Sequence, residues 1–392
     1  MAKRFIGVGT FNTSKKARLY VNQALYNNRL SYDPFMKKFE KDFSSLHQCK
    51  FGIMSNSGTS ALHIAVAALK NIHKWNDNDE IIVPSVTFVA TSNVVIHNNM
   101  KPVFVDVEKD YYNIDVNLIE DKITDKTRAI IPVHLFGLPC DMDPIKKLAA
   151  KYGLKIIEDS CETMFASYKG RRVGSLGDIG CFSTYIAHLI TTGVGGINTT
   201  NNPDYAVMLR SLMNHGRDSI YISIDDAKGK SKKDMKEVIE GRFRFIHLGH
   251  SFRATEMEAA LGLAQLENWQ AMIRKRRENA KYLIKGLSKF EGKIQLHEIR
   301  KNCDHSFMMF PIVMIKEKKG KIVNYLESKG IETREMLPLI NQPIYQEMFN
   351  IDVNDYPVAN WINNNGFYIG CHQDLKYGDL DYIIKVFNEF FR

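Results

Sequence analysis

The chain has 392 residues, of which 44% are hydrophobic and 25% charged, and its net charge is +9. This length suits about two domains with a large core, and the even spread of Lys and Arg argues against a nucleic-acid partner. A positive field of this kind favours an anionic small substrate such as a phosphate ester.

The N-terminal segment has no apolar run behind its basic residues, and no apolar run approaches the roughly 20 residues of a membrane helix. We therefore expect a cytoplasmic protein without a membrane partner. The six cysteines form no CxxC pair, which predicts reduced thiols and no metal site.

Short β-branched runs alternate with helical patterns between residues 52 and 210. Strands are predicted at residues 51–55, 80–84, 103–107, 129–134, 155–159, 180–184 and 196–200. Several of them are apolar throughout, as strands covered on both faces are. Helical spacing at 61–70 and 145–152 completes the alternation, which predicts an α/β domain with a mostly parallel central sheet.

The pattern changes near residue 250. Residues 254–286 predict one or two long charged helices, followed by a strand at 309–315 and a helix at 321–328. We therefore expect a large α/β domain over residues 1–250 and a small α+β C-terminal domain over residues 251–392.

Polar residues follow two of the predicted strands. Residues 55–60, SNSGTS, precede a helix and form either a phosphate seat or an ordinary Ser/Thr cap. Asp159 and Glu162 follow the apolar strand 155–159, where ligands of open α/β sheets bind. A carboxylate at Asp159 could hold a protonated ring nitrogen or cap a turn.

Two further strand ends carry candidate site residues. Phe88 could stack on a flat ring, although a Phe is more often part of the core. Ser183 and His188 follow a third strand, and a lone His is usually structural. Together these positions predict a site for an aromatic phosphate.

The order of these motifs resembles the DegT/DnrJ/EryC/StrS sugar aminotransferase family of pyridoxal-phosphate proteins, which have fold type I. The resemblance runs nearly end to end. Its motifs include MSNSGTSALHIA, VPSVTFVATSN, IIEDSCET, GDIGCFSTYIAHLITTGVGG, HSFRATEMEAALGLAQL and GIETREMLPLINQPIYQ.

The resemblance implies roles for individual residues. The cofactor phosphate would bind Gly58, Thr59 and Ser183. Phe88 would stack on the pyridine ring, Asp159 would hold its N1 so that the ring acts as an electron sink, and Glu162 would replace the usual Gln beside O3′.

Other implied positions concern partners and substrate. The family forms homodimers with shared active sites, and Ser251 occupies the position of a partner-chain Asn that reaches the phosphate. Arg334 would lie near the cofactor or substrate phosphates or form a plain surface ion pair, and His372 would line the sugar pocket. His215 would lie near the reacting carbon or the amino donor, or be a structural residue of its loop.

One departure from the family pattern decides the expected chemistry. His188 stands where transaminating members have the lysine that binds the cofactor covalently. An imidazole cannot form that bond, but it can move protons near neutral pH. A His at this place is similar to the 3-dehydratase subgroup, most of all to members acting on GDP-4-keto-6-deoxy-D-mannose.

We therefore expect a 3-dehydratase of a nucleotide-linked 4-keto-6-deoxyhexose that uses pyridoxamine 5′-phosphate, regenerated from pyridoxal 5′-phosphate with glutamate. His188, with His215 as a second candidate, would supply acid–base catalysis. No Cys lies between His188 and Cys303, which argues against an iron–sulfur cluster. The alternatives are an aminotransferase that makes an amino sugar and a non-catalytic cofactor-binding homologue.

Overall fold

The structure, a computed structural model, describes residues 4–218, 231, 236 and 243–392. Its largest sheet has seven strands in the order β1-β9-β8-β5-β4-β2-β3. Their bounds are β1 (Phe51–Ser55), β2 (Glu80–Pro84), β3 (Lys101–Val105), β4 (Thr127–Ile130), β5 (Lys155–Asp159), β8 (Ile179–Ser183) and β9 (Gly196–Thr200). The run from β3 to β8 is parallel, whereas β9 pairs antiparallel with both β8 and β1. The predicted mostly parallel sheet is confirmed.

One predicted strand ends early. Strand β4 stops at Ile130, although the sequence predicted a strand up to residue 134. Pro132 has no N–H to donate to a ladder, and beyond it Val133 makes only an isolated bridge to Asp159. The chain therefore leaves the sheet beside the end of β5.

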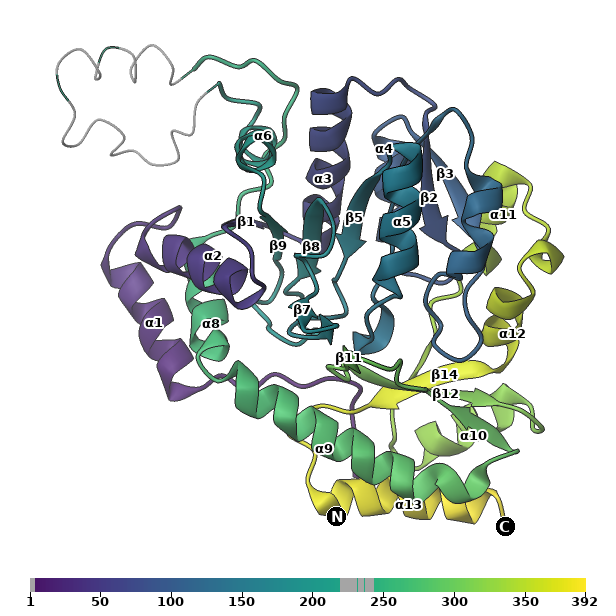
Figure 1. The fold of residues 1–392 in the computed structure, drawn as a ribbon. Coiled ribbons are helices and arrows are strands. Elements are labelled where there is room, and N and C mark those ends of the chain that lie inside the picture. The colour runs from purple at the N-terminus through teal and green to yellow at the C-terminus, as the bar shows by residue number, and fades with distance from the viewer. Residues whose placement is uncertain (1–3, 219–230, 232–235, 237–242) are drawn as a thin grey trace.

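Helices flank this sheet (Figure 1). They are α2 (Pro34–Leu46), α3 (Gly58–His73), α4 (Ala90–His97), α5 (Met142–Tyr152) and α6 (Pro203–Met213). Helix α3 packs on β8 and β9 and also against α4 and α6. Because it is covered on several sides, most of its side chains are apolar and buried. This packing places the N-terminus of α3 at the end of β8.

The C-terminal part has its own four-stranded antiparallel sheet, ordered β10-β12-β14-β13. Its strands are β10 (Ile294–Leu296), β12 (Met309–Met314), β13 (Thr333–Glu335) and β14 (Gly366–Gly370), and a small third sheet joins β6 (Ser167–Tyr168), β7 (Arg171–Arg172) and β11 (Cys303–Asp304). The helices are α9 (Trp269–Leu287), α10 (Lys319–Ser328), α11 (Pro343–Phe349), α12 (Pro357–Asn365) and α13 (Tyr377–Phe390). The buried apolar side chains of this part form a second core, separate from the core around the large sheet, and Ile6 near the N-terminus packs into it. The domain division at residue 250 stays a prediction.

Helix α8 (Glu256–Leu266) packs against α1 (Lys15–Tyr26) and α2. The buried Glu256 carboxylate accepts hydrogen bonds from the N–H groups of Asp33, Phe35 and Met36, at 2.5, 3.0 and 3.1 Å. These N–H groups belong to the first turn of α2 and have no partner within that helix. No helix in the described ranges is both long and apolar enough to span a membrane.

Replacing Glu256 with Ala should leave the first N–H groups of α2 without an acceptor. We expect the free energy of unfolding to fall by about 1–3 kcal/mol, measured by urea denaturation. The exposed Glu291→Ala should change it little. Equal effects of the two substitutions would contradict the role of Glu256.

Candidate active site

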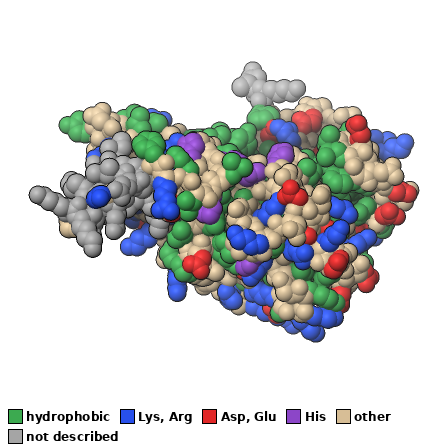
Figure 2. Space-filling view, turned by 90° about the horizontal axis from the view of Figure 1, so that it is seen from above, with side chains coloured by type: hydrophobic (Ala, Val, Ile, Leu, Met, Phe, Trp, Pro, Cys, Tyr) green, Lys and Arg blue, Asp and Glu red, His purple; other side chains and the backbone are tan. Residues whose placement is uncertain are grey.

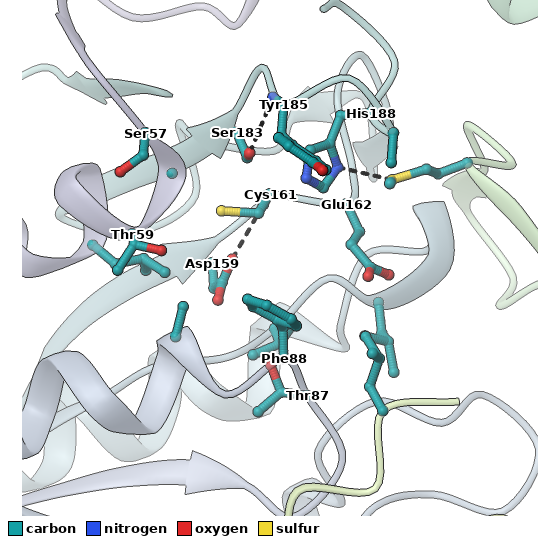
Figure 3. A pocket seen from close by; sticks show the side chains of 18 of the residues that line it. Ser57, Thr59, Thr87, Phe88, Asp159, Cys161, Glu162, Ser183, Tyr185 and His188 are labelled. Atoms are coloured by element: carbon teal, nitrogen blue, oxygen red, sulfur yellow. Dashed lines mark hydrogen bonds between the residues drawn. The ribbon is translucent and has the colours of Figure 1, made fainter. Parts of the chain in front are cut away.

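The ends of β1, β5 and β8 meet around a cavity of about 400 Å³ (Figure 3). Seven residues predicted from the sequence line it, namely Gly58, Thr59, Phe88, Asp159, Glu162, Ser183 and His188. The C-terminal part closes the same cavity with Met308, Met309, Leu337 and Tyr368. Both parts of the chain therefore build one site.

The N-terminus of α3 forms one wall. The Ser57 hydroxyl accepts a hydrogen bond from the Ser60 N–H at 3.0 Å, and the Ser57 carbonyl accepts from the Ala61 N–H. The N–H groups of Gly58 and Thr59 begin the helix beside the cavity, at the positive end of its dipole. Ser57 is thus the cap, and Gly58 and Thr59 supply an anion seat.

Gly58 is needed because strand β8 comes very close. A Cβ atom at Gly58 would lie 2.6 Å from the Cβ of Ser183, closer than any real contact. The absence of a side chain brings the Ser183 hydroxyl to the helix start. Backbone N–H groups and a hydroxyl at this place suit a phosphate group.

Asp159 forms the base of the cavity and is only 4% exposed. Its carboxylate accepts from the Thr91 hydroxyl at 2.7 Å and from the Cys161 N–H at 3.1 Å. Burial raises the pKa of Asp159. No Lys or Arg lines the cavity as described, so a protonated ring nitrogen would supply the positive charge that this carboxylate lacks.

Phe88 and Glu162 also line the cavity. The Phe88 ring is 57% exposed, which is unusual for a large apolar side chain and leaves its face free to stack on a flat ligand. Glu162 is buried and accepts from the Phe136 N–H at 3.0 Å. Burial raises the pKa of Glu162 to about 7.

His188 lies in the loop that joins β8 to β9. Its ring faces the cavity, and Nδ1 is 3.4 Å from the Met308 sulfur. Burial lowers the pKa of His188 to about 4, so its imidazole is neutral near pH 7 and can accept a proton.

The loop around His188 is held from several sides. The hydroxyls of Thr184 and Thr192 are 2.7 Å apart, and a Cβ at Gly195 would lie within 2.5 Å of both. Gln265 of α8 exchanges two hydrogen bonds with the backbone of Thr191. These hydrogen bonds and close contacts therefore fix the conformation of the loop and with it the position of His188.

Four predicted site residues lie outside this cavity. His215 and Ser251 lie together, each about 3 Å from the guanidinium of Arg253, at 3.2 and 3.1 Å. Arg334 is exposed on β13 and pairs with Glu332. His372 is buried, and its Nδ1 has no hydrogen-bond partner in the described part of the chain.

Several residues that build the site were not predicted, namely the lining residues Met308 and Tyr368 and the buried Thr91, which donates to Asp159. Thr91 lies in the quoted VTFVATSN motif, one helical turn after Thr87, whose hydroxyl it contacts at 2.8 Å. Its place at the start of a helix was a usable signal. Met308 and Tyr368 reach the site only through tertiary packing, and no local pattern marks them.

The seven-stranded sheet, the anion seat, the buried Asp159 and the stacking face define a fold type I pyridoxal-phosphate enzyme. The residues present fit that cofactor, because the helix start, the exposed Phe88 ring and Asp159 match its phosphate, its ring and its ring nitrogen.

Residues 12–388 match the model of the DegT/DnrJ/EryC1/StrS aminotransferase family, and the chain belongs to this family. The lipopolysaccharide biosynthesis protein RfbH of Salmonella typhimurium is 33% identical, covering 96% of this chain and 90% of its own length. A GDP-perosamine synthase of Escherichia coli O157:H7 is 31% identical over 99% of both chains.

A solved structure shows the same fold. The E. coli GDP-4-keto-6-deoxy-D-mannose-3-dehydratase with bound hydrated PLP is 25% identical and has a TM-score of 0.88. The match covers 98% of this chain and 100% of that one. The predictions of family and fold are confirmed.

The raised pKa of Glu162 should be visible in the stability of the cofactor-free protein. Its carboxyl is neutral in the fold up to about pH 7 but charged above about pH 4.5 when unfolded. The contribution of this carboxyl group to the free energy of unfolding is therefore fully present below about pH 4.5. It is lost as the pH rises to about 7.

Glu162→Gln removes this titration, so the variant should gain stability relative to wild type between pH 5 and pH 8. The gain should be at most roughly 3 kcal/mol, measured by urea denaturation at both pH values. Glu291→Gln serves as the exposed control. A difference between variant and wild type that does not depend on pH would contradict the shift.

Proposed function

We propose that this protein is a 3-dehydratase of a nucleotide-linked 4-keto-6-deoxyhexose that uses pyridoxal and pyridoxamine 5′-phosphate. The single observation that carries the proposal is His188 in the cavity, together with the absence of lysine among the residues that line it. Without a lysine amine, the described residues of the cavity offer the cofactor no covalent anchor.

When bound, the cofactor supplies an electron sink for bond cleavage next to a carbonyl carbon. The N–H groups of Gly58 and Thr59 and the Ser183 hydroxyl would hold its phosphate, and Phe88 would pack on its ring. Asp159 would pair with the ring nitrogen and keep it protonated, while Glu162 would lie beside O3′.

His188 moves the protons of the reaction. Its neutral imidazole would take up at Nε2 the proton lost from the C4′ carbon of the cofactor and deliver it to the C3 hydroxyl of the sugar, which would leave as water. Over the whole reaction the sugar would exchange its C3 hydroxyl for hydrogen, while the amine form of the cofactor would be oxidised to the aldehyde form and release its nitrogen as ammonia. Glutamate would then restore the amine form. The reaction is assigned to the cytoplasm.

A second copy of the chain would complete the site. Tyr185, Ile186 and Val194 of the His188 loop are about half exposed, and Leu248 is fully so. The face seen from above shows histidines interspersed with hydrophobic side chains (Figure 2). Burying these side chains in a homodimer would remove them from water.

The dimer would also explain the residues outside the cavity. Ser251, with Arg253 and His215 beside it, would approach the phosphate and the reacting carbon in the partner's cavity. Arg334 and His372 are proposed to contact the nucleotide-sugar substrate, on the family pattern.

The second candidate is an aminotransferase that makes an amino sugar, and the GDP-perosamine synthase relative favours it. Among the described residues, the cavity has no lysine for that chemistry. Formation of an amino sugar would support this second candidate. A non-catalytic homologue is disfavoured by the retained anion seat and Asp159.

Replacing His188 with Asn should remove the proton carrier and leave the phosphate seat intact. We expect ammonia release from a 4-keto sugar nucleotide and glutamate to fall by about 10²–10⁴-fold. The control is cofactor affinity, measured by fluorescence titration, which should change little. Full residual turnover would remove His188 from the mechanism.

Borohydride should fail to attach the aldehyde form of the cofactor to the wild-type polypeptide, because His188 offers no amine. The His188→Lys variant, loaded and reduced in parallel, should gain the mass of one reduced cofactor in intact-mass spectrometry. The same mass gain at a lysine of the wild type would refute the proposal.

A further inference from the structure

We propose that Met308 is a positioning residue that selects the tautomer of His188, and that the buried pair His297 and His305 holds Met308 in place. The inference rests on the proposed role of His188. It concerns residues of the C-terminal part, which carry no recognisable site motif.

The first step is the contact between Met308 and His188. A thioether sulfur can accept a hydrogen bond but has no proton to donate. At 3.4 Å from the sulfur, Nδ1 of His188 must therefore carry the proton if the two atoms are bonded. The imidazole is neutral, so Nε2 then holds the free lone pair. Met308 thereby makes Nε2 the basic nitrogen of the site.

The second step is the backbone that carries Met308. Phe307 has a φ of +49° and Phe136 a φ of +57°, a region that bulky side chains rarely occupy. The Met308 N–H donates to the Phe136 carbonyl at 3.1 Å. The buried Arg276 donates to the carbonyl oxygens of Phe307 and Met308 at 3.2 and 2.9 Å. The strained corner is thus fixed by its neighbours.

The third step is the histidine pair, whose hydrogen bonds run in one direction. The Phe307 N–H donates to Nδ1 of His305 at 2.8 Å, so the ring proton of a neutral His305 lies on Nε2. That proton points to Nδ1 of His297, 3.0 Å away. His297 must then carry its own proton on Nε2, which faces the Tyr111 carbonyl at 3.3 Å.

Both imidazole rings have to stay neutral for this series of hydrogen bonds to form. A second proton on either ring would place two N–H groups face to face. His297 and His305 are buried, and burial lowers the pKa of His297 to about 4. Burial, the neighbouring His297 ring and the Arg277 cation lower the pKa of His305 well below its usual value.

The backbone at Phe136 also makes a hydrogen bond to a second residue of the cavity, Glu162. Phe136, whose carbonyl accepts from Met308, donates its own N–H to the Glu162 carboxylate. One strained backbone pair therefore helps to position two titratable residues that line the cavity, His188 and Glu162.

The test is the tautomer of each histidine in the cofactor-free protein, read from two-bond proton–nitrogen correlations with ¹⁵N-labelled histidine. His188→Asn and His305→Asn assign the signals. We expect the Nδ1–H form for His188 and the Nε2–H form for His305 at neutral pH. The Nε2–H form at His188, or the Nδ1–H form at His305, would overturn the inference.

Met308→Leu keeps the volume but removes the acceptor, so the His188 signals should shift toward the Nε2–H form. In the loaded enzyme kcat should fall about two- to tenfold, the equivalent of one net hydrogen bond, with little change in KM. The control is Met314→Leu, the same change at a fully buried position of β12 that faces the second core. It should alter neither the tautomer nor kcat.

Failure of this inference differs from failure of the proposed function. If His188→Asn retains turnover, the proposed catalytic role fails, whatever the tautomer of His188. If the His188 tautomer is unchanged in Met308→Leu, the positioning role fails even when His188→Asn is inactive.

Discussion

The site depends on the close approach of the α3 N-terminus to the end of β8. Gly58 allows this approach, because a side chain there would collide with Ser183. The contact puts free backbone N–H groups and a hydroxyl at one point, and it fixes where β8 delivers the loop that carries His188. Asp159 at the end of β5 is the second feature of the site, since the described lining residues include no Lys or Arg to pair with its buried carboxylate. A bound ring with one phosphate and one protonated nitrogen satisfies both features at once.

The large-domain strands and their order of alternation were predictable because parallel strands covered on both faces are apolar throughout. The residues at strand ends, such as Asp159 and Phe88, could be found because ligands bind there in open α/β sheets. The ends of strands were less predictable, as Pro132 shows by ending β4 early.

The residues that the C-terminal part adds to the site could not be predicted from the amino-acid sequence. Met308 directly precedes the apolar strand β12 and Tyr368 lies in the apolar strand β14, so both look like core residues, and only tertiary packing turns them toward the cavity. The same holds for His297 and His305, which are far from any motif yet form a buried hydrogen-bonded pair. Functional positioning of this kind depends on contacts between segments more than 100 residues apart, as the 120-residue separation of His188 and Met308 illustrates.

The central claim is that an imidazole in the place of a lysine turns this cavity from amine transfer to loss of a hydroxyl. The most direct test is the product formed from GDP-4-keto-6-deoxy-D-mannose and glutamate in D₂O, analysed by NMR. The account predicts a sugar that has lost its C3 oxygen, carries deuterium at C3 and keeps the C4 ketone. A product with the C3 hydroxyl intact and an amine at C4 would contradict it.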